Sequence, residues 1–309
     1  MRHDILAMVT AANPPVEFDY REAFSRNLGL VSEAEQASLR EARVAIAGLG
    51  GVGGVHLVAL ARLGIGGFAI ADLDRFELAN MNRQAGATIQ TLGRAKVDVM
   101  AEMAAAINPS AEVRCFPAGL DAGNIDPFLE GSIAAVDGID FFNMDARRLL
   151  FQRARQHGIH ALTAAPVGFG ATLHVFGPTG ITFDDYFDLH DGMALPEQLF
   201  NFVLGLAPKR AHRRYFPPGA VDLAARRAPS LALGCFMAAV LVATEVANLV
   251  LGRRPPQLAP RYSQFDPLVQ TYKTGRLWRG NRGPVQRAKK WWVLRTTPAL
   301  RRLLRDAGR

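Results

Sequence analysis

Short apolar runs alternate with longer amphipathic stretches between residues 43 and 176. The runs are rich in small and branched apolar residues and predict strands at 44–47, 67–72, 112–117, 133–137, 159–164 and 171–176. In three intervening stretches apolar residues recur every three or four positions, which predicts helices at about 52–63, 93–107 and 146–157. This alternation indicates an α/β fold with a doubly wound, mostly parallel sheet and helices on both of its faces.

The pattern changes on either side of this region. Residues 1–42 contain few apolar positions and one predicted helix at 32–41, where Ser32 and Glu35 have the spacing of a capping box. An apolar run of about twenty residues near the C-terminal third is long enough to cross a membrane. Because Glu245 interrupts it and no second such run exists in the sequence, we expect a buried core helix instead.

A glycine-rich loop follows the first predicted strand and opens the first predicted helix. Its frame, Gly48-x-Gly50-Gly51-x-Gly53, is typical of a loop that binds nucleotide phosphates at a helix N-terminus. Asp72 ends the next strand, where a Rossmann-type fold places an acid that accepts hydrogen bonds from ribose; the alternative is a turn aspartate. The loop alone does not distinguish NAD, FAD and ATP.

The composition is that of a globular enzyme. Of 309 residues, 49% are hydrophobic and 21% are charged, which excludes a disordered chain. Two cysteines, Cys115 and Cys235, cannot form a disulfide framework, so a reducing, cytoplasmic setting is the expectation. The first twelve residues hold no long apolar run of the kind that a signal peptide needs.

Positive charge is concentrated at the C-terminus. The net charge is +8, yet the segment from Arg253 onward holds 15 basic and two acidic residues, so the rest of the chain is mildly acidic. The tail at 276–309 combines 11 basic residues with Trp278, Trp291 and Trp292. Basic residues beside aromatic ones could contact an acidic partner protein, nucleic acid or a membrane surface. A solvated extension with one short amphipathic helix is the alternative.

Several spaced motifs carry a resemblance to a known family. After the glycine loop come Asp72-x-Asp74, Asn80-x-x-Arg83-Gln84, Gly93-x-x-Lys96-Val97 and Val136-Asp137-x-x-Asp140. Their order and spacing resemble the ThiF/MoeB/ubiquitin-activating (UBA) family. The resemblance implies an N-terminal helical arm (1–42), a Rossmann-like ATP-binding adenylation domain (43–275) and a basic tail (276–309). Within the domain it implies a crossover segment (177–227) that determines specificity.

The resemblance also implies a chemistry. Such enzymes adenylate a carboxylate with MgATP and release pyrophosphate, so the site needs positioned cations more than a base. Arg83 and Lys96 are expected over the triphosphate, and Asp140 is expected to hold Mg²⁺. In homodimeric relatives an N-terminal arginine enters the partner's site, which suggests Arg26, or alternatively Arg21. The expected nucleotide-binding residues are Gly48, Gly50, Gly51, Gly53, Asp72, Asp74, Asn80, Arg83, Gln84 and Lys96.

Two features depart from the family pattern. The chain lacks the two CxxC pairs of the family's zinc site, so no structural zinc is expected. The crossover segment at 177–227 contains no cysteine, and Cys235 is expected to be an inert core thiol, so a thioester intermediate is not expected. The expected substrate is the C-terminus of a ubiquitin-like or sulfur-carrier protein, a peptide or a small acid.

Two other functions use the same glycine loop. One is an NAD(P)- or FAD-dependent oxidoreductase, and the other is a non-catalytic nucleotide-binding module that docks a partner through its basic tail. Arg83, Lys96 and Asp140 favour adenylation over the oxidoreductase, because a dinucleotide does not need them.

Overall fold

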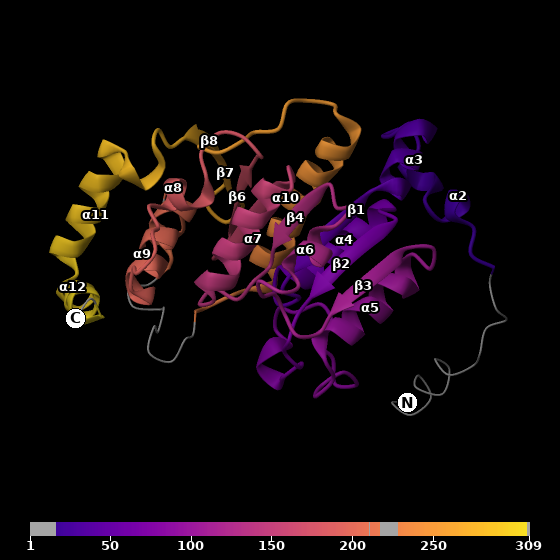
Figure 1. The fold of residues 1–309 in the computed structure, drawn as a ribbon, viewed down its shortest axis with the longest axis horizontal. Helices are drawn as coiled ribbons and strands as arrows, with labels where there is room; N and C mark the ends of the chain where they lie inside the picture. Colours follow the sequence, from indigo (N-terminus) through magenta and orange to yellow (C-terminus); the bar gives the residue numbers. More distant parts are fainter. Residues whose placement is uncertain (1–16, 210, 217–227, 308–309) are drawn as a thin grey trace.

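The protein is built around one eight-stranded sheet (Figure 1). The computed structural model describes residues 17–209, 211–216 and 228–307. The strands are arranged in the order β3-β2-β1-β4-β5-β6-β7-β8; β1 to β5 are parallel, and β6 to β8 extend the sheet in antiparallel fashion. Their bounds are β1 (Arg43–Ala47), β2 (Gly67–Ala71), β3 (Glu112–Phe116), β4 (Ala134–Asp137), β5 (His160–Val167), β6 (Gly170–Phe176), β7 (Arg261–Asp266) and β8 (Thr271–Arg276).

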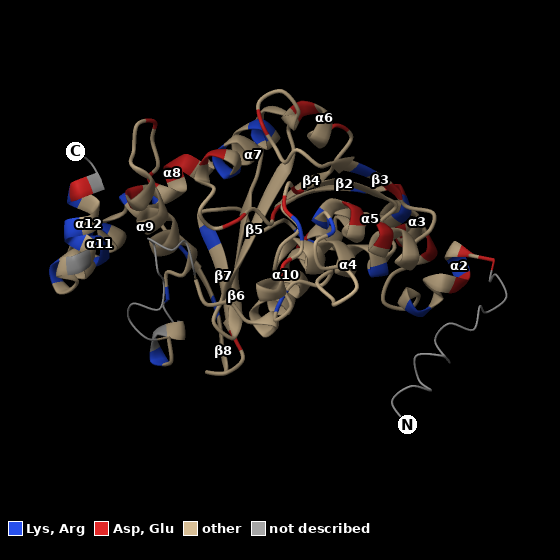
Figure 2. Cartoon of the chain, turned by 90° about the horizontal axis from the view of Figure 1, so that it is seen from below, with Lys and Arg blue, Asp and Glu red and all other residues tan. Residues whose placement is uncertain are grey.

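Helices cover both faces of the sheet (Figures 1 and 2). One layer consists of α4 (Gly53–Leu63), α5 (Lys96–Ile107) and α10 (Ala232–Leu251). The opposite layer consists of α6 (Ile125–Leu129), α7 (Met144–Gln156), α8 (Phe183–Phe187) and α9 (Leu195–Leu206). Alternate residues of a strand face opposite layers, so Val44 and Ile46 pack under α4 and α10 while Ala45 and Ala47 face α6 and α7. The predicted doubly wound α/β fold is confirmed.

The hairpin of β7 and β8 was not predicted. Its strands read RYSQFD and TYKTGR, and the buried positions of β7 include Gln264 and Asp266. A strand with polar residues on both faces lacks the apolar alternation on which the prediction depends. The short α6 was missed because five residues do not establish a helical period.

The apolar run forms α10, which lies along β5, β6 and α4. Among the described residues it is the one helix whose length and composition would allow it to cross a membrane. The buried Glu245 forms an ion pair with Arg254. The expectation of a buried helix holds for the inner face only, because Leu233, Phe236 and Val240 on the outer face are each more than half exposed.

The N-terminal arm packs on the C-terminal end of α4. It comprises α2 (Tyr20–Ala23), the 3₁₀ turn η1 (Ser25–Asn27) and α3 (Glu33–Glu41). The Tyr20 hydroxyl donates to the Gly64 carbonyl at 2.6 Å, just after α4 ends. The predicted capping box of Ser32 and Glu35 is present. The arm is therefore attached at the end of α4 that lies away from the glycine loop.

The tail lies at the opposite end of the molecule from the arm (Figure 1). After β8 the chain forms the short turn η4 (Gly280–Arg282) and then two helices, α11 (Pro284–Thr296) and α12 (Pro298–Ala307). The short amphipathic helix expected around Leu300 to Leu304 is α12, whereas α11 was not predicted. Two further 3₁₀ turns, η2 (Leu78–Asn80) and η3 (Ala211–Arg214), lie in loops.

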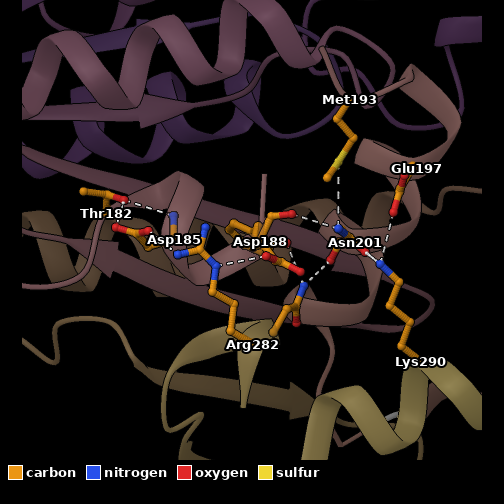
Figure 3. A network of polar contacts seen from close by, with 10 residues as sticks. Thr182, Asp185, Asp188, Met193, Glu197, Asn201, Arg282 and Lys290 are labelled. Carbon is orange, nitrogen blue, oxygen red and sulfur yellow. Dashed lines mark hydrogen bonds and ion pairs between the residues drawn. The ribbon is translucent and has the colours of Figure 1, made fainter. Parts of the chain in front are cut away.

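Part of the tail fastens the crossover segment, so it is not simply a solvated extension (Figure 3). Arg282 donates to Asp185 within α8 at 2.8 Å and to Asp188, the C-cap of α8, at 2.9 Å. From α11, Lys290 donates to Glu197 at 3.2 Å and to Asn201 at 3.0 Å on α9. We call this set of contacts the clasp; it fixes α8 and α9 against the tail.

A buried histidine should make the fold sensitive to acid. His56 in α4 is fully buried, has no hydrogen-bond partner in the described part of the chain, and its pKa is lowered by burial to about 3. In the unfolded chain it titrates near pH 6.5, so below that pH the unfolded state binds more protons and the free energy of unfolding falls. The loss is up to about 1.4 kcal/mol per pH unit from this residue.

We therefore expect His56→Leu to flatten the dependence of stability on pH between about pH 6 and pH 4. Urea unfolding at several pH values measures this. His190→Leu, at an exposed position, serves as the control and should leave the slope unchanged. Equal slopes in the wild type and His56→Leu would contradict the prediction.

Candidate active site

A cleft of about 950 Å³ opens at the carboxyl ends of β1, β2 and β4. Four residues expected from the sequence line it: Gly48, Asp72, Asp74 and Asp140. The N-terminal end of α7 and the loop between α8 and α9 form the opposite side. Carboxyl ends of parallel strands are where ligands bind in open α/β sheets. This cleft is therefore the candidate active site.

The glycine loop has a shape suited to phosphate. A Cβ on Gly53 would lie 1.7 Å from the carbonyl oxygen of Gly48, so the start of α4 packs directly on the loop and only glycine fits. At Gly50, by contrast, a Cβ would meet nothing closer than Gln84 at 3.7 Å. The chain itself does not require glycine at that position. Of the four loop glycines only Gly48 lines the cleft, whereas Gly50, Gly51 and Gly53 do not.

Asp72 connects β2 to the glycine loop. Its carboxylate accepts backbone hydrogen bonds from Leu49 at 2.6 Å and from Asp74 at 2.8 Å. Burial raises the pKa of Asp72 above its ordinary value. Asp72 therefore does act as a turn aspartate. Its carboxylate also lines the cleft, and its oxygens can accept a further hydrogen bond. Ribose binding by Asp72 remains a prediction.

Lys96 pairs with Asp74 and is not itself among the residues that line the cleft. It is the first residue of α5, and its side chain is only 7% exposed. Its ammonium donates to the Asp74 carboxylate at 2.9 Å, and its backbone N–H donates to the Asp74 carbonyl at 2.9 Å. The structure therefore brings Asp72, Asp74 and Lys96 together, with the ammonium paired to a carboxylate.

Arg83 lies beside the glycine loop, but its side chain is hydrogen-bonded to residues of the turn that precedes it. Its guanidinium donates to the Ala79 carbonyl at 2.9 Å and to the Asn82 side chain at 2.8 Å. Its side-chain carbons pass 3.6 Å from the place where a Cβ of Gly51 would lie. Arg83 is not among the residues that line the cleft, so contact with phosphate would require a change of rotamer.

Asn80 and Gln84 also flank the loop. The Asn80 side chain accepts from the Glu77 backbone N–H at 3.1 Å and so stabilises η2. Gln84 is buried directly behind Gly50. Both lie near the loop that the sequence assigned them to, and neither lines the cleft.

Asp140 presents its carboxylate from the loop that follows β4. The residue is exposed, and one carboxylate oxygen accepts from the Phe142 backbone N–H at 2.8 Å. A buried arginine, Arg147, supports this loop from below: it donates to the carbonyls of Ile139 at 2.6 Å and Asp140 at 3.1 Å. It also pairs with the buried Asp137 at 2.9 Å.

Sequence reasoning missed Arg147. It occupies a position on α7 in register with the buried residues Met144, Leu150 and Ala154. An arginine on an otherwise apolar stripe indicates a buried ion pair, because an unpaired charge is too costly there. That signal could have identified Arg147 as a buried ion-pair residue, although not its contacts with the Asp140 loop.

The crossover segment supplies the far wall of the cleft. Gln198 donates to the Met193 carbonyl at 2.8 Å, which orients its amide so that Oε1 points away from that carbonyl. Among the described residues Oε1 has no hydrogen-bond partner. Nearby, Arg148 pairs with Asp184 at 2.7 Å and Asp191 at 2.8 Å. The sequence predicted that the crossover segment lies at the substrate side of the site. It predicted no role there for Gln198 or Arg148.

Two predicted residues lie away from the cleft of their own chain. Arg26 is exposed in η1, on the arm at the C-terminal end of α4, whereas Gly53 begins that helix about 16 Å away. Arg21 is also on the arm and pairs with Glu33 at 3.2 Å. Neither arginine can contribute to the site within one chain.

The two cysteines lie outside the cleft lining of the described chain. Cys235 is fully buried in α10, and burial raises the pKa of its thiol. A Cβ on Gly51 would lie 3.1 Å from its sulfur, so the thiol is packed against the back of the glycine loop. The expected inert core thiol agrees with this position. Cys115 is exposed on β3.

Comparison with known proteins decides the family. The profile of the ThiF family matches residues 24–283. The chain belongs to the ThiF family. This ThiF-family chain is 29% identical to the sulfur carrier protein adenylyltransferase of Thermus thermophilus over 252 residues, covering 81% of the chain and 84% of the relative. It is 31% identical to the tRNA threonylcarbamoyladenosine dehydratase of Haemophilus influenzae over 151 residues, covering 48% of the chain and 57% of that protein.

The fold comparisons agree with the ThiF assignment. The crystal structure of PaaA superimposes with a TM-score of 0.62 at 19% identity, covering 89% of the chain and 80% of PaaA. The structure of Escherichia coli MccB with ATP gives 0.61 at 17% identity, covering 87% and 76%. The predicted family and fold are confirmed. The chain matches only part of the length of the dehydratases: 57% of the Haemophilus influenzae protein and 35% of the Bacillus subtilis protein.

Proposed function

We propose that this ThiF-family chain is an ATP-dependent adenylyltransferase that activates a carboxylate as an acyl-adenylate. The observation that carries the proposal is one cleft lined by Gly48 of the glycine loop, Asp72, Asp74 and Asp140, with Lys96 paired to Asp74. The relative from Thermus thermophilus is named an adenylyltransferase, which supports it. An oxidoreductase would use the loop and Asp72 but has no evident use for Asp140 and Lys96.

In this reaction a carboxylate oxygen of the substrate attacks the α-phosphate, a P–O bond to the β-phosphate breaks, and pyrophosphate leaves. The backbone N–H groups at the start of α4 would bind phosphate oxygens. Lys96 and Arg83 would stabilise the negative charge that builds on the leaving group, after exchanging their present acceptors for phosphate. Asp72 would orient the ribose.

Magnesium fits the donors that the cleft offers. No group of three or more His, Cys, Asp or Glu residues gathers as a metal site within 17–209, 211–216 and 228–307. Mg²⁺ in nucleotide sites is commonly held by one or two carboxylates together with phosphates and water. Asp140 would be the protein ligand, and the cation would neutralise charge on the phosphates.

The acyl substrate would enter beside the crossover segment. We propose the C-terminus of a ubiquitin-like or sulfur-carrier protein, a peptide or a small acid, with the free Oε1 of Gln198 available to a donor on it. Because neither cysteine lines the cleft, the acyl group would pass from the adenylate directly to the final nucleophile, without a thioester.

ATP–pyrophosphate exchange tests the proposed function. The panel comprises carrier proteins, short peptides and small acids, with total tRNA added because relatives carry the name tRNA threonylcarbamoyladenosine dehydratase. We expect exchange that depends on at least one of these. A purified protein that absorbs as a flavin or nicotinamide complex would contradict the proposal. Tight ATP binding without exchange for any substrate would indicate the non-catalytic module.

We further propose a homodimer in which Arg26 reaches the partner's cleft. The outer face of α10 supports this, because Leu233, Phe236 and Val240 are 59%, 56% and 58% exposed and form an apolar surface suited to a second copy. Arg26 is exposed and distant from its own cleft. In a twofold dimer each arm would serve the other site.

Complementation between variants tests this arrangement. Arg26→Ala and Asp140→Asn should each be inactive alone. After subunit exchange, half of the dimers are mixed and hold one intact site, so about a quarter of wild-type exchange activity should return. Sedimentation provides the oligomeric state. A monomer, or mixing without recovery, would contradict the proposal.

A further inference from the structure

The helices α11 and α12 lie beyond the stretch that matches the ThiF family profile. The match to the ThiF family ends at residue 283, directly before α11. The inner side of α11 is accounted for: Gln286 is buried and donates to the Leu204 carbonyl at 2.9 Å, and Lys290 belongs to the clasp (Figure 3).

The outer side of α11 carries alternating arginine and tryptophan. Arg287, Trp291 and Arg295 follow one another at intervals of four residues and therefore share one face, with Trp292 beside them. Trp291 is 61% exposed and Trp292 is 45% exposed. The Arg295 guanidinium stacks over the Trp291 ring, 5.3 Å from its centroid. We call these four residues the Trp–Arg face.

The surroundings of this face are strongly basic. Figure 2 shows Lys and Arg gathered on α11 and α12. Within 276–307, Arg282, Lys290 and Arg305 form ion pairs. The following arginines have no carboxylate within 4 Å among the described residues: Arg276, Arg279, Arg287, Arg295, Arg301 and Arg302. Six guanidinium groups without a carboxylate partner create a positive surface that attracts polyanions.

We propose that the Trp–Arg face binds single-stranded nucleic acid. Exposed indole rings stack on bases, and the neighbouring arginines contact phosphates; this combination gives binding that tolerates any sequence. Trp278, 63% exposed, forms a second stacked pair with Arg276 at 4.8 Å, just before η4.

Other anionic partners fit less well. A helix that lies on a membrane presents a continuous apolar stripe to the lipid, whereas here arginines interrupt the tryptophans. The apolar residues Leu300 and Leu304 of α12 are partly buried, and α12 packs against α9 and α11. An acidic polypeptide would engage the arginines but has no bases for the indole faces to stack on.

The proposal can be tested by fluorescence anisotropy with the full chain in the absence of ATP. The probes are fluorescein-labelled 12-mers of oligouridylate and oligodeoxythymidylate. Anisotropy should rise with either probe, and the one bound more tightly identifies RNA or DNA. For three or four phosphate contacts, affinity should fall about 20- to 50-fold between 50 and 200 mM salt. Trp291→Ala and Trp292→Ala should each weaken binding by about 5- to 150-fold.

A conservative variant and a matched control distinguish a loss of base stacking from a general loss of structure. Trp291→Phe should retain most of the affinity, because phenylalanine also stacks. Tyr272→Ala removes an equally exposed aromatic side chain from β8, 61% exposed, and should change nothing. Wild-type affinity in the Trp291→Ala/Trp292→Ala double variant would overturn the proposal. So would binding to phosphatidylserine vesicles or polyglutamate with no binding to either oligonucleotide.

Discussion

Asp140→Asn should lower the rate of ATP–pyrophosphate exchange by about 100- to 1000-fold, the range found when one group that stabilises transition-state charge is removed. The exposed Asp140 carboxylate is the proposed ligand of Mg²⁺ in the cleft. The amide oxygen of asparagine can still accept from the Phe142 N–H, so the loop should keep its conformation. Loss of charge, not loss of structure, is the expected cause.

The matched control for this prediction is Asp98→Asn, which removes an exposed carboxylate from the first turn of α5. It should exchange at the wild-type rate. Both variants should unfold at the same urea concentration as the wild type. An Asp140→Asn protein that exchanges within about twofold of the wild-type rate would remove Asp140 from the proposed mechanism.

Arg147→Met should lower the free energy of unfolding by about 3–5 kcal/mol, the cost typical of breaking a buried ion pair. The side chains of Arg147 and Asp137 are only 3% and 2% exposed, so the variant leaves a carboxylate buried without its partner. The carbonyls of the Asp140 loop lose their donor at the same time. Exchange activity should therefore fall as well. Urea unfolding measures the first effect and pyrophosphate exchange the second.

A surface pair provides the comparison for Arg147. Arg153 pairs with Asp126 where both side chains are more than 30% exposed, so Arg153→Met should cost no more than about 1 kcal/mol. The double variant Arg147→Met/Asp137→Leu should recover part of the lost stability, because it removes the orphaned charge. If Arg147→Met cost as little as Arg153→Met, the buried pair would not support the loop as described.

The fold was predictable where the chain follows a simple period. The parallel strands and their helices lie within a few residues of the predicted ranges, because both faces of such a sheet are buried and the apolar runs are distinct. The hairpin of β7 and β8 lies at the sheet edge with polar residues on both sides, so its sequence holds no such signal.

The candidate site was predictable as a set of residues but not as a set of contacts. Gly48, Asp72 and Asp140 converge because each follows a parallel strand, and such strand ends meet at one edge. The pairing of Lys96 with Asp74, and the folding of Arg83 onto Ala79, depend on side-chain geometry that motif spacing does not encode. The role of Arg26 involves a second chain and stays a prediction.

The clasp links the crossover segment to a part of the chain about one hundred residues away, and this has a consequence for redesign. Arg282 and Lys290 hold α8 and α9, and the loop between those helices walls the cleft. Transplanting residues 177–227 alone into another ThiF-family scaffold would leave Asp185, Asp188 and Glu197 without these partners. If the crossover segment determines substrate preference as proposed, residues 177–227 and the tail residues that hold them would have to be transferred together.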